Sequence, residues 1–176
     1  MAVGLAPAMR RYRVADTAGD ERYTRPATVA LCARLARVAR FTLDVAACLA
    51  AHVAPEYFTR DVDGRRCSWW GDVWCNPPYS DVRPWVEKAW AEMSRRGPRT
   101  ISMLLPDVRC HQMWWSELVE PYRDGRPSAE RGVTLETHFL AGRHAFDRAG
   151  RGGRRLKPKH NRPPFGLVLL VWRRTR

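Results

Sequence analysis

Acidic residues are scarce in this chain, and the shortage dominates its electrostatics. The 176 residues contain 18 Asp and Glu against 31 Lys and Arg, which gives a formal net charge of +13. Such an excess opposes compaction through self-repulsion and attracts polyanions. Nucleic acid is therefore the expected partner.

Long apolar runs are missing as well. The longest uninterrupted one, residues 165–172, has eight residues, which is too short to span a bilayer. We interpret it as a buried strand and expect no membrane association. The apolar stretch at residues 2–9 precedes Arg10 and Arg11, the reverse of the order in a secretory signal. Residues 1–20 are therefore expected to form a flexible leader.

Paired cysteines are also absent. The five cysteines are odd in number and widely spaced, with no CxxC pair and no His cluster. This pattern predicts reduced thiols, as expected of a cytoplasmic protein, and no metal site. The length fits one domain with its own core, which we place at residues 21–176.

The spacing of apolar residues predicts helices that alternate with strands. Helical spacing covers residues 26–39, 84–93 and 113–119. Strands are expected at residues 41–47, 72–75, 100–105, 133–140 and 165–172. The alternation predicts an α/β domain with a mostly parallel sheet, and the last two strands predict an antiparallel pair at its edge.

A basic segment separates these last two strands. Residues 143–162 contain eight Lys and Arg, one Asp and three Gly. We expect a DNA-backbone clamp, because phosphate contacts need mobile cations; the alternative is a solvated, flexible loop. The candidate DNA-binding residues are Arg143, Arg151, Arg154, Arg155, Lys157, Lys159 and Arg162. Arg109, Arg123 and Arg126 are further candidates for contacts with base edges or phosphates.

The tetrapeptide Asn76-Pro77-Pro78-Tyr79 follows a predicted strand and carries the chemistry. An exocyclic adenine amine is a poor nucleophile because its lone pair is delocalised into the ring. The Asn76 side-chain oxygen and the Pro77 carbonyl can each accept one of its hydrogens. Two acceptors localise the lone pair and stabilise positive charge as it develops.

The neighbouring residues suit this role. The two prolines fix φ and remove backbone donors, which holds the carbonyl beside Asn76 rigidly. Tyr79 offers a flat face on which an extruded base can stack, a contribution of about 1–3 kcal/mol per base. The competing interpretation is a rigid Pro-Pro turn that only ends a strand.

Several segments resemble the phage-type DNA adenine-N6 methyltransferases. They are residues 21–26, 41–47, 57–59, 73–80, 84–89 and 103–106. The resemblance implies a Rossmann-like methyltransferase fold, S-adenosylmethionine as methyl donor, and residues 76–79 as the active loop. It also implies direct transfer without a covalent enzyme intermediate and without a metal.

The same resemblance assigns the cofactor side of the site. Thr24 and Pro26 are similar to an element that packs near the methionine portion. Asp44, followed by Val45 and Ala46, is similar to the acidic end of the first strand, beside which the cofactor binds. Asp63 is similar to the acid that reads the cofactor adenine, and Asp61 is the alternative. From the residues alone, Asp44 and Asp63 could instead serve only turns.

Glycine is lacking where methyltransferases commonly have a Gly-rich turn. Ala46, Ala47 and Cys48 stand there, so positive φ values are harder to reach. Only 32 positions separate Asp44 from Asn76, so connecting elements must be trimmed.

The leading hypothesis is methylation of adenine N6 in DNA. The alternatives are methylation of RNA adenine or of a protein glutamine amide, and a catalytically inactive DNA-binding relative. The positive charge ranks nucleic acid above protein as substrate.

Overall fold

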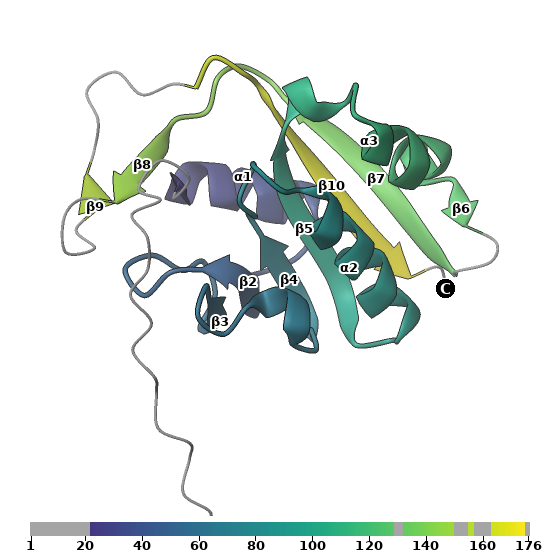
Figure 1. The fold of residues 1–176 in the computed structure, drawn as a ribbon, viewed down its shortest axis with the longest axis horizontal. Coiled ribbons are helices and arrows are strands. Elements are labelled where there is room, and N and C mark those ends of the chain that lie inside the picture. Colours follow the sequence, from purple (N-terminus) through teal and green to yellow (C-terminus); the bar gives the residue numbers. More distant parts are fainter. Residues whose placement is uncertain (1–21, 129–131, 150–154, 157–162, 175–176) are drawn as a thin grey trace, which may run out of the picture.

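A twisted seven-stranded sheet forms the centre of the protein in a computed structural model that describes residues 22–128, 132–149, 155–156 and 163–174 (Figure 1). The strand order is β3-β2-β4-β5-β10-β7-β6. The bounds are β2 Leu43–Ala47, β3 Glu56–Thr59, β4 Gly71–Cys75, β5 Pro98–Pro106, β6 Pro127–Ser128, β7 Val133–Leu140 and β10 Leu167–Arg174. The predicted α/β architecture is confirmed.

The strand directions confirm a mostly parallel sheet. Strands β3, β2, β4 and β5 pair in parallel. Strand β10 is antiparallel to both β5 and β7, so β7 runs in the same direction as β5. The last two long strands therefore pair as predicted, but β10 lies inside the sheet and not at its edge. The first six residues of β10 are buried. A continuously apolar strand is most stable inside a sheet, where both of its faces are covered by other parts of the protein.

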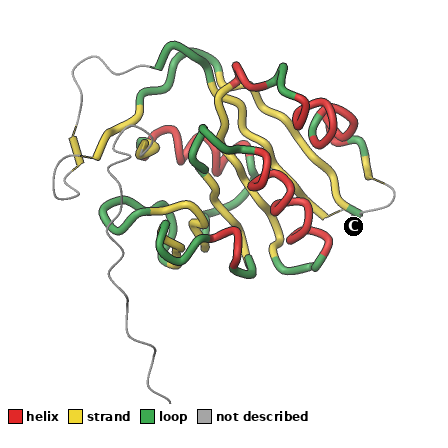
Figure 2. The backbone as a smooth tube through the Cα atoms, viewed as in Figure 1, coloured by secondary structure: helices red, strands yellow, loops and turns green. Residues whose placement is uncertain are grey.

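Helices cover both faces of this sheet, as the tube in Figure 2 also shows. Helix α1 (Pro26–Leu35) packs on one face, where its Cys32 joins Phe41, Trp74 and Leu169 in one core cluster. Helices α2 (Arg83–Ser94) and α3 (Met113–Leu118) pack on the other face. The described residues also include three short 3-10 segments: η1 Gly64–Arg66, η2 Asp107–Arg109 and η3 Glu120–Gly125.

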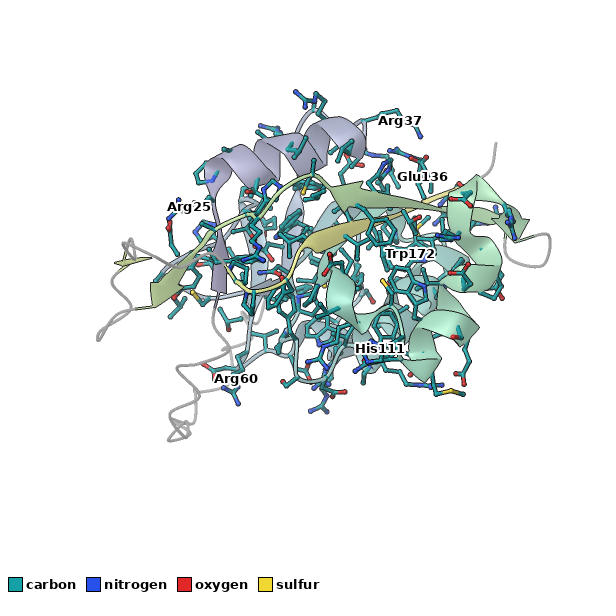
Figure 3. All side chains as sticks on the ribbon, turned by 90° about the horizontal axis from the view of Figure 1, so that it is seen from above. Arg25, Arg37, Arg60, His111, Glu136 and Trp172 are labelled. Atoms are coloured by element: carbon teal, nitrogen blue, oxygen red, sulfur yellow. The ribbon has the colours of Figure 1, made fainter. Side chains whose placement is uncertain are left out.

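Helix α1 ends four residues before the predicted boundary. Arg37 has a φ of 50°, and the Val38 amide donates to the Ala33 carbonyl at 3.0 Å. This backbone arrangement is typical of a left-handed helix end. The Arg37 side chain also pairs with Glu136 of β7, which fixes the end of the helix against the sheet (Figure 3).

A second, three-stranded sheet was not predicted. Strand β8 (Phe146–Ala149) pairs antiparallel with β1 (Arg22–Thr24) and with β9 (Arg155–Leu156). The segment predicted as a basic loop therefore contains two short strands. Its single acid, Asp147, is buried and accepts a hydrogen bond of 3.0 Å from Arg25, a residue outside this segment, so it does not neutralise the cations of the segment itself.

Two further sequence predictions concern composition. All five cysteines are free thiols, in agreement with the expected reduced state. No helix in the described ranges is long and apolar enough to cross a bilayer. The predicted leader, residues 1–20, lies outside the described residues.

Candidate active site

The carboxyl ends of β2 and β4 open onto a cavity of about 950 Å³. This volume falls at the upper end of the range of about 300–1,000 Å³ usual for small-molecule sites. Its wall contains all of the predicted catalytic and cofactor residues: Thr24, Pro26, Asp44, Val45, Ala46, Asp63, Asn76, Pro77, Pro78 and Tyr79. Parallel strands bring their carboxyl ends to one edge of a sheet, and ligands of open α/β sheets bind there.

The loop at residues 76–79 follows the buried end of β4, and hydrogen bonds fix both its side chains and its backbone. The Tyr79 hydroxyl donates to Asn76 Oδ1 at 2.9 Å. The Pro78 carbonyl, rather than that of Pro77, accepts the Asp81 amide at 3.4 Å. Arg109 donates through Nη2 to the Tyr79 carbonyl at 3.2 Å, across 30 positions of sequence. Asn76 is half-buried and Pro77 buried, so their oxygens belong to a constrained turn.

Tyr79 is less accessible than the sequence suggests. Its ring is 8% exposed and meets Phe146 and Phe165 edge to face, with ring centroids 6.3 and 6.0 Å away. Neither phenylalanine is signalled by the sequence, because their proximity to the loop arises only in the fold. The stacking of a target base on Tyr79 stays a prediction.

Asp44 closes the turn that lacks glycine. The carboxylate is 3% exposed and accepts hydrogen bonds from the Ala46 amide at 3.2 Å and the Val53 amide at 2.9 Å. Cys48 and Ala51 exchange two backbone hydrogen bonds of 3.2 Å within the same turn. The turn thus forms without a positive φ between residues 44 and 53, all of which are described. Asp44 both lines the cavity and organises its wall.

Burial raises the pKa of Asp44 to about 6, although the Val53 and Ala46 amides and the nearby His52 oppose the rise. Between about pH 4 and 6, Asp44 is therefore still protonated in the folded protein but already deprotonated in the unfolded chain. Because the folded state binds more protons in this window, the contribution of Asp44 to the free energy of unfolding falls as pH rises through it.

The variant Asp44→Asn isolates this effect. Its substituted side chain does not titrate, so the free energy of unfolding of the wild type minus that of the variant should decrease by roughly 2–3 kcal/mol from pH 4 to 7. Urea unfolding at a series of pH values measures both curves. Glu56→Gln, which changes an exposed carboxylate at the start of β3, serves as control. Parallel curves for wild type and Asp44→Asn would contradict the assignment.

Asp63 caps a short helix at the same wall. Its φ is 54°, and its carboxylate accepts hydrogen bonds from the Arg65 amide at 3.2 Å and from Arg65 Nε at 3.0 Å. The Arg65 guanidinium accordingly lowers the pKa of Asp63. The turn interpretation of Asp63 therefore holds, and the residue also faces the cavity. Asp61 does not line it.

Gly64, next to this cap, allows η1 to lie directly against β2. A Cβ at this position would overlap the Val45 carbonyl oxygen. The Gly64 carbonyl also accepts a hydrogen bond of 2.7 Å from the Trp69 indole, which anchors the segment in the core. Only a residue without a side chain fits between the strand and the indole.

Gly64→Ala is expected to cost about 1–3 kcal/mol in the free energy of unfolding, because the added methyl group must push two backbones apart. Denaturant unfolding measures the loss. The control is Gly142→Ala, where φ is +79° and an added Cβ would have none of the surrounding described atoms within 4 Å. That variant reports backbone strain without overlap, about 1 kcal/mol. A smaller loss at Gly64 than at Gly142 would contradict the close approach.

A polar group without a partner points to a ligand. Thr24 Oγ1 is buried and has no hydrogen-bond partner within the described part of the chain. Native proteins seldom leave such groups unsatisfied, so an unmatched hydroxyl in a cavity wall is typical of a ligand contact. The same wall supplies the carboxylates Asp44 and Asp63 and the cation Arg40 among alanines. This set fits a charged nucleoside cofactor such as the one the resemblance implies.

The described residues contain no group of three or more His, Cys, Asp or Glu placed to hold a metal ion. The prediction that the reaction needs no metal stays a prediction.

The predicted DNA-binding residues are only partly placed. Arg143 is exposed beyond the end of β7, and Arg155 belongs to β9. The remaining candidates lie outside the described residues: Arg151, Arg154, Lys157, Lys159 and Arg162. The cavity wall also includes His52, Arg60 and Arg65, which no sequence motif indicated.

Comparison with known proteins identifies the family. The family model described as DNA N-6-adenine-methyltransferase (Dam) matches residues 15–124. No curated protein gives a significant sequence match.

Two solved structures are similar in outline. The first is a protein of Pyrococcus horikoshii described as an RNA methyltransferase, with 13% identity and a TM-score of 0.39 over 69% of this chain and 50% of that chain. The second is the 23S rRNA methyltransferase ErmE, with 13% identity and a TM-score of 0.45 over 86% of this chain and 69% of that chain. This chain thus spans half the length of the first.

Proposed function

Because the chain belongs to the DNA N-6-adenine-methyltransferase family, we propose that it transfers a methyl group from S-adenosylmethionine to the exocyclic N6 amine of adenine in DNA. The observation that carries the proposal is the position of Asn76 and Pro77. Their oxygens follow β4 directly and line the same cavity as the end of β2. A base amine and a cofactor can therefore meet in one cavity.

The cofactor supplies an electrophilic methyl group. On the protein side, the Thr24 hydroxyl and Pro26 would contact its methionine portion. Asp44, Val45 and Ala46 of β2 would lie beside its nucleoside, and Asp63 would lie at the adenine end. Arg65 holds Asp63 in place through two side-chain hydrogen bonds.

Asn76 and Pro77 would act on the amine. Each oxygen accepts one N–H, which draws the nitrogen towards a tetrahedral shape and stabilises its developing positive charge. A stacked base hides this amine within the duplex, so the target adenine must be extruded into the cavity. The exposed Arg143 and the basic segment that follows it would hold the flanking phosphates.

Three other functions fit parts of the site. RNA adenine and a protein glutamine amide present the same kind of nitrogen, but a glutamine substrate does not account for eleven Lys and Arg against one Asp from residue 143 to the end. An inactive DNA-binding relative would explain the missing glycines. The closed turn at Asp44 weakens that explanation, because it supplies an alternative way to shape the cofactor wall.

One experiment separates these functions. The protein is incubated with labelled S-adenosylmethionine and with unmethylated genomic DNA, RNA or protein in parallel. Nucleoside mass spectrometry then measures N6-methyladenine, and single-molecule sequencing locates it. We expect label in DNA as N6-methyladenine. Label only in RNA or protein, or DNA binding without any cofactor binding at millimolar concentration, would replace the proposal with the corresponding alternative.

A further inference from the structure

Three contacts converge on Tyr79. Its ring meets Phe146 and Phe165 edge to face, and its carbonyl accepts a hydrogen bond from Arg109. We call these three residues the Tyr79 bracket. Phe146 lies in β8 of the small sheet, Phe165 just before β10, and Arg109 in η2, so three separate parts of the chain fix one residue: the phenylalanines contact its ring, and Arg109 its backbone.

The bracket holds the Tyr79 hydroxyl on Asn76 Oδ1 at 2.9 Å. A tyrosine that served only as a stacking platform would not need this contact, and a ring that is 8% exposed has little face to offer. The hydroxyl therefore has a separate role towards Asn76. A side-chain carbonyl oxygen has two lone pairs, so it can accept from Tyr79 and from a second donor together.

The orientation of the Asn76 amide decides whether an amine can bind. An amide presents an acceptor oxygen on one side and a donor NH2 on the other. A target amine is a donor here, so it binds only on the side where the oxygen lies. A hydroxyl that donates to the oxygen favours that orientation.

We infer that Tyr79 is a positioning residue: its hydroxyl keeps the Asn76 oxygen turned towards the substrate amine, and the Tyr79 bracket keeps the hydroxyl in place. The inference rests on the proposed function for the identity of the amine. It adds a role for the tyrosine that does not depend on stacking. It also gives Phe146 and Arg109 an effect on the reaction without contact with substrate.

Tyr79→Phe tests the hydroxyl alone, because the ring and its packing are kept. The rate of a single turnover should fall about 3- to 10-fold, the loss of one hydrogen bond, while the KM for DNA and for cofactor stays unchanged. Tyr122→Phe is the matched control, since that ring packs on Trp90 away from the cavity (centroids 4.8 Å apart). An unchanged rate in Tyr79→Phe would overturn the inference, as would an increase, which would make the hydroxyl a competitor of the substrate.

The bracket is tested by a double-mutant cycle. Phe146→Leu should lower the turnover rate in the wild type but have a smaller effect in the Tyr79→Phe background, because its influence passes through the hydroxyl. Equal effects in both backgrounds would assign Phe146 to stability alone. The melting temperature of each variant identifies any that do not fold, and Tyr79→Phe then decides by itself.

A spectroscopic measurement tests the orientation without turnover. The chain has only two asparagines, Asn76 and Asn161, so selective 15N labelling of asparagine gives two side-chain NH2 signals. Tyr79→Phe should shift or broaden the Asn76 signal, and Tyr122→Phe should leave it in place. An unmoved signal would overturn the inference even in a protein without DNA methylation activity, whereas absent methylation with a moved signal would count against the proposed function only.

Discussion

Replacing Asn76 with Ala should reduce the rate of methyl transfer by about 100-fold or more, the usual effect of removing one preorganised polar group that stabilises charge in a transition state. The substitution removes the oxygen that accepts one amine hydrogen and leaves only the Pro77 carbonyl. Single-turnover assays with adenine-containing duplex measure the rate. Isothermal calorimetry measures the affinity for S-adenosylmethionine, which should stay close to that of the wild type.

The turnover rate and the cofactor affinity together distinguish a loss of catalysis from a disruption of the cavity. Asn76 is half-buried and is contacted by the Tyr79 hydroxyl, so its removal leaves the buried strand β4 intact. Glu87→Gln on the exposed face of α2, where Glu87 pairs only with a neighbouring arginine in the described structure, provides the control. A parallel loss of cofactor affinity in Asn76→Ala would place Asn76 in cofactor binding instead.

Raising the salt concentration should weaken DNA binding steeply. Six phosphate contacts would lower the affinity about 10³-fold between 50 and 200 mM salt, because each contact releases condensed counterions. The formal charge of +13 and the burial of Asp147 against Arg25 leave the basic segment with little internal compensation. Fluorescence anisotropy with a labelled duplex gives the slope of affinity against salt.

The salt dependence of DNA binding can also be tested at a single residue, Arg143. Arg143→Ala should reduce the slope of log affinity against log salt concentration by about 1, the loss of one phosphate contact. The control is Arg95→Ala, which removes an exposed cation just beyond the end of α2, where the side chain is 72% exposed and pairs with Glu92. A flat salt response in the wild type would remove the phosphate clamp from the proposal. Equal slopes for Arg143→Ala and the wild type would place Arg143 away from the DNA.

The alternation of apolar patterns was enough to predict most of the main sheet. Strands β2, β4, β5, β7 and β10 and helices α1, α2 and α3 lie within a few residues of the predicted ranges. Each of these elements is long enough, or apolar enough, for its own residues to show the period. Strand β3 was missed because it has four residues, of which only Tyr57 and Phe58 are large aromatics, and these carry too little periodic signal.

Pairing between distant residues could not be predicted in this way. Strand β1 finds its partner in β8, where Thr24 lies opposite Phe146. Strand β10 inserts between β5 and β7, although β7 precedes it in the chain. Both choices depend on which faces remain to be buried once the rest of the sheet has formed, and no local pattern contains that information.

The same division applies to the active site. The sequence by itself determined the chemical groups: a rigid Asn-Pro-Pro-Tyr turn behind a strand, an acid within an earlier strand, and an excess of cations near the carboxyl end. These groups can be identified from the sequence because each depends only on a residue and its immediate neighbours. Only the tertiary structure decided that Asp44 closes its own turn, and that Phe146, Phe165 and Arg109 hold Tyr79 on Asn76. These contacts join residues that are far apart in the chain, so they exist only when the sheet brings the ends of its strands together.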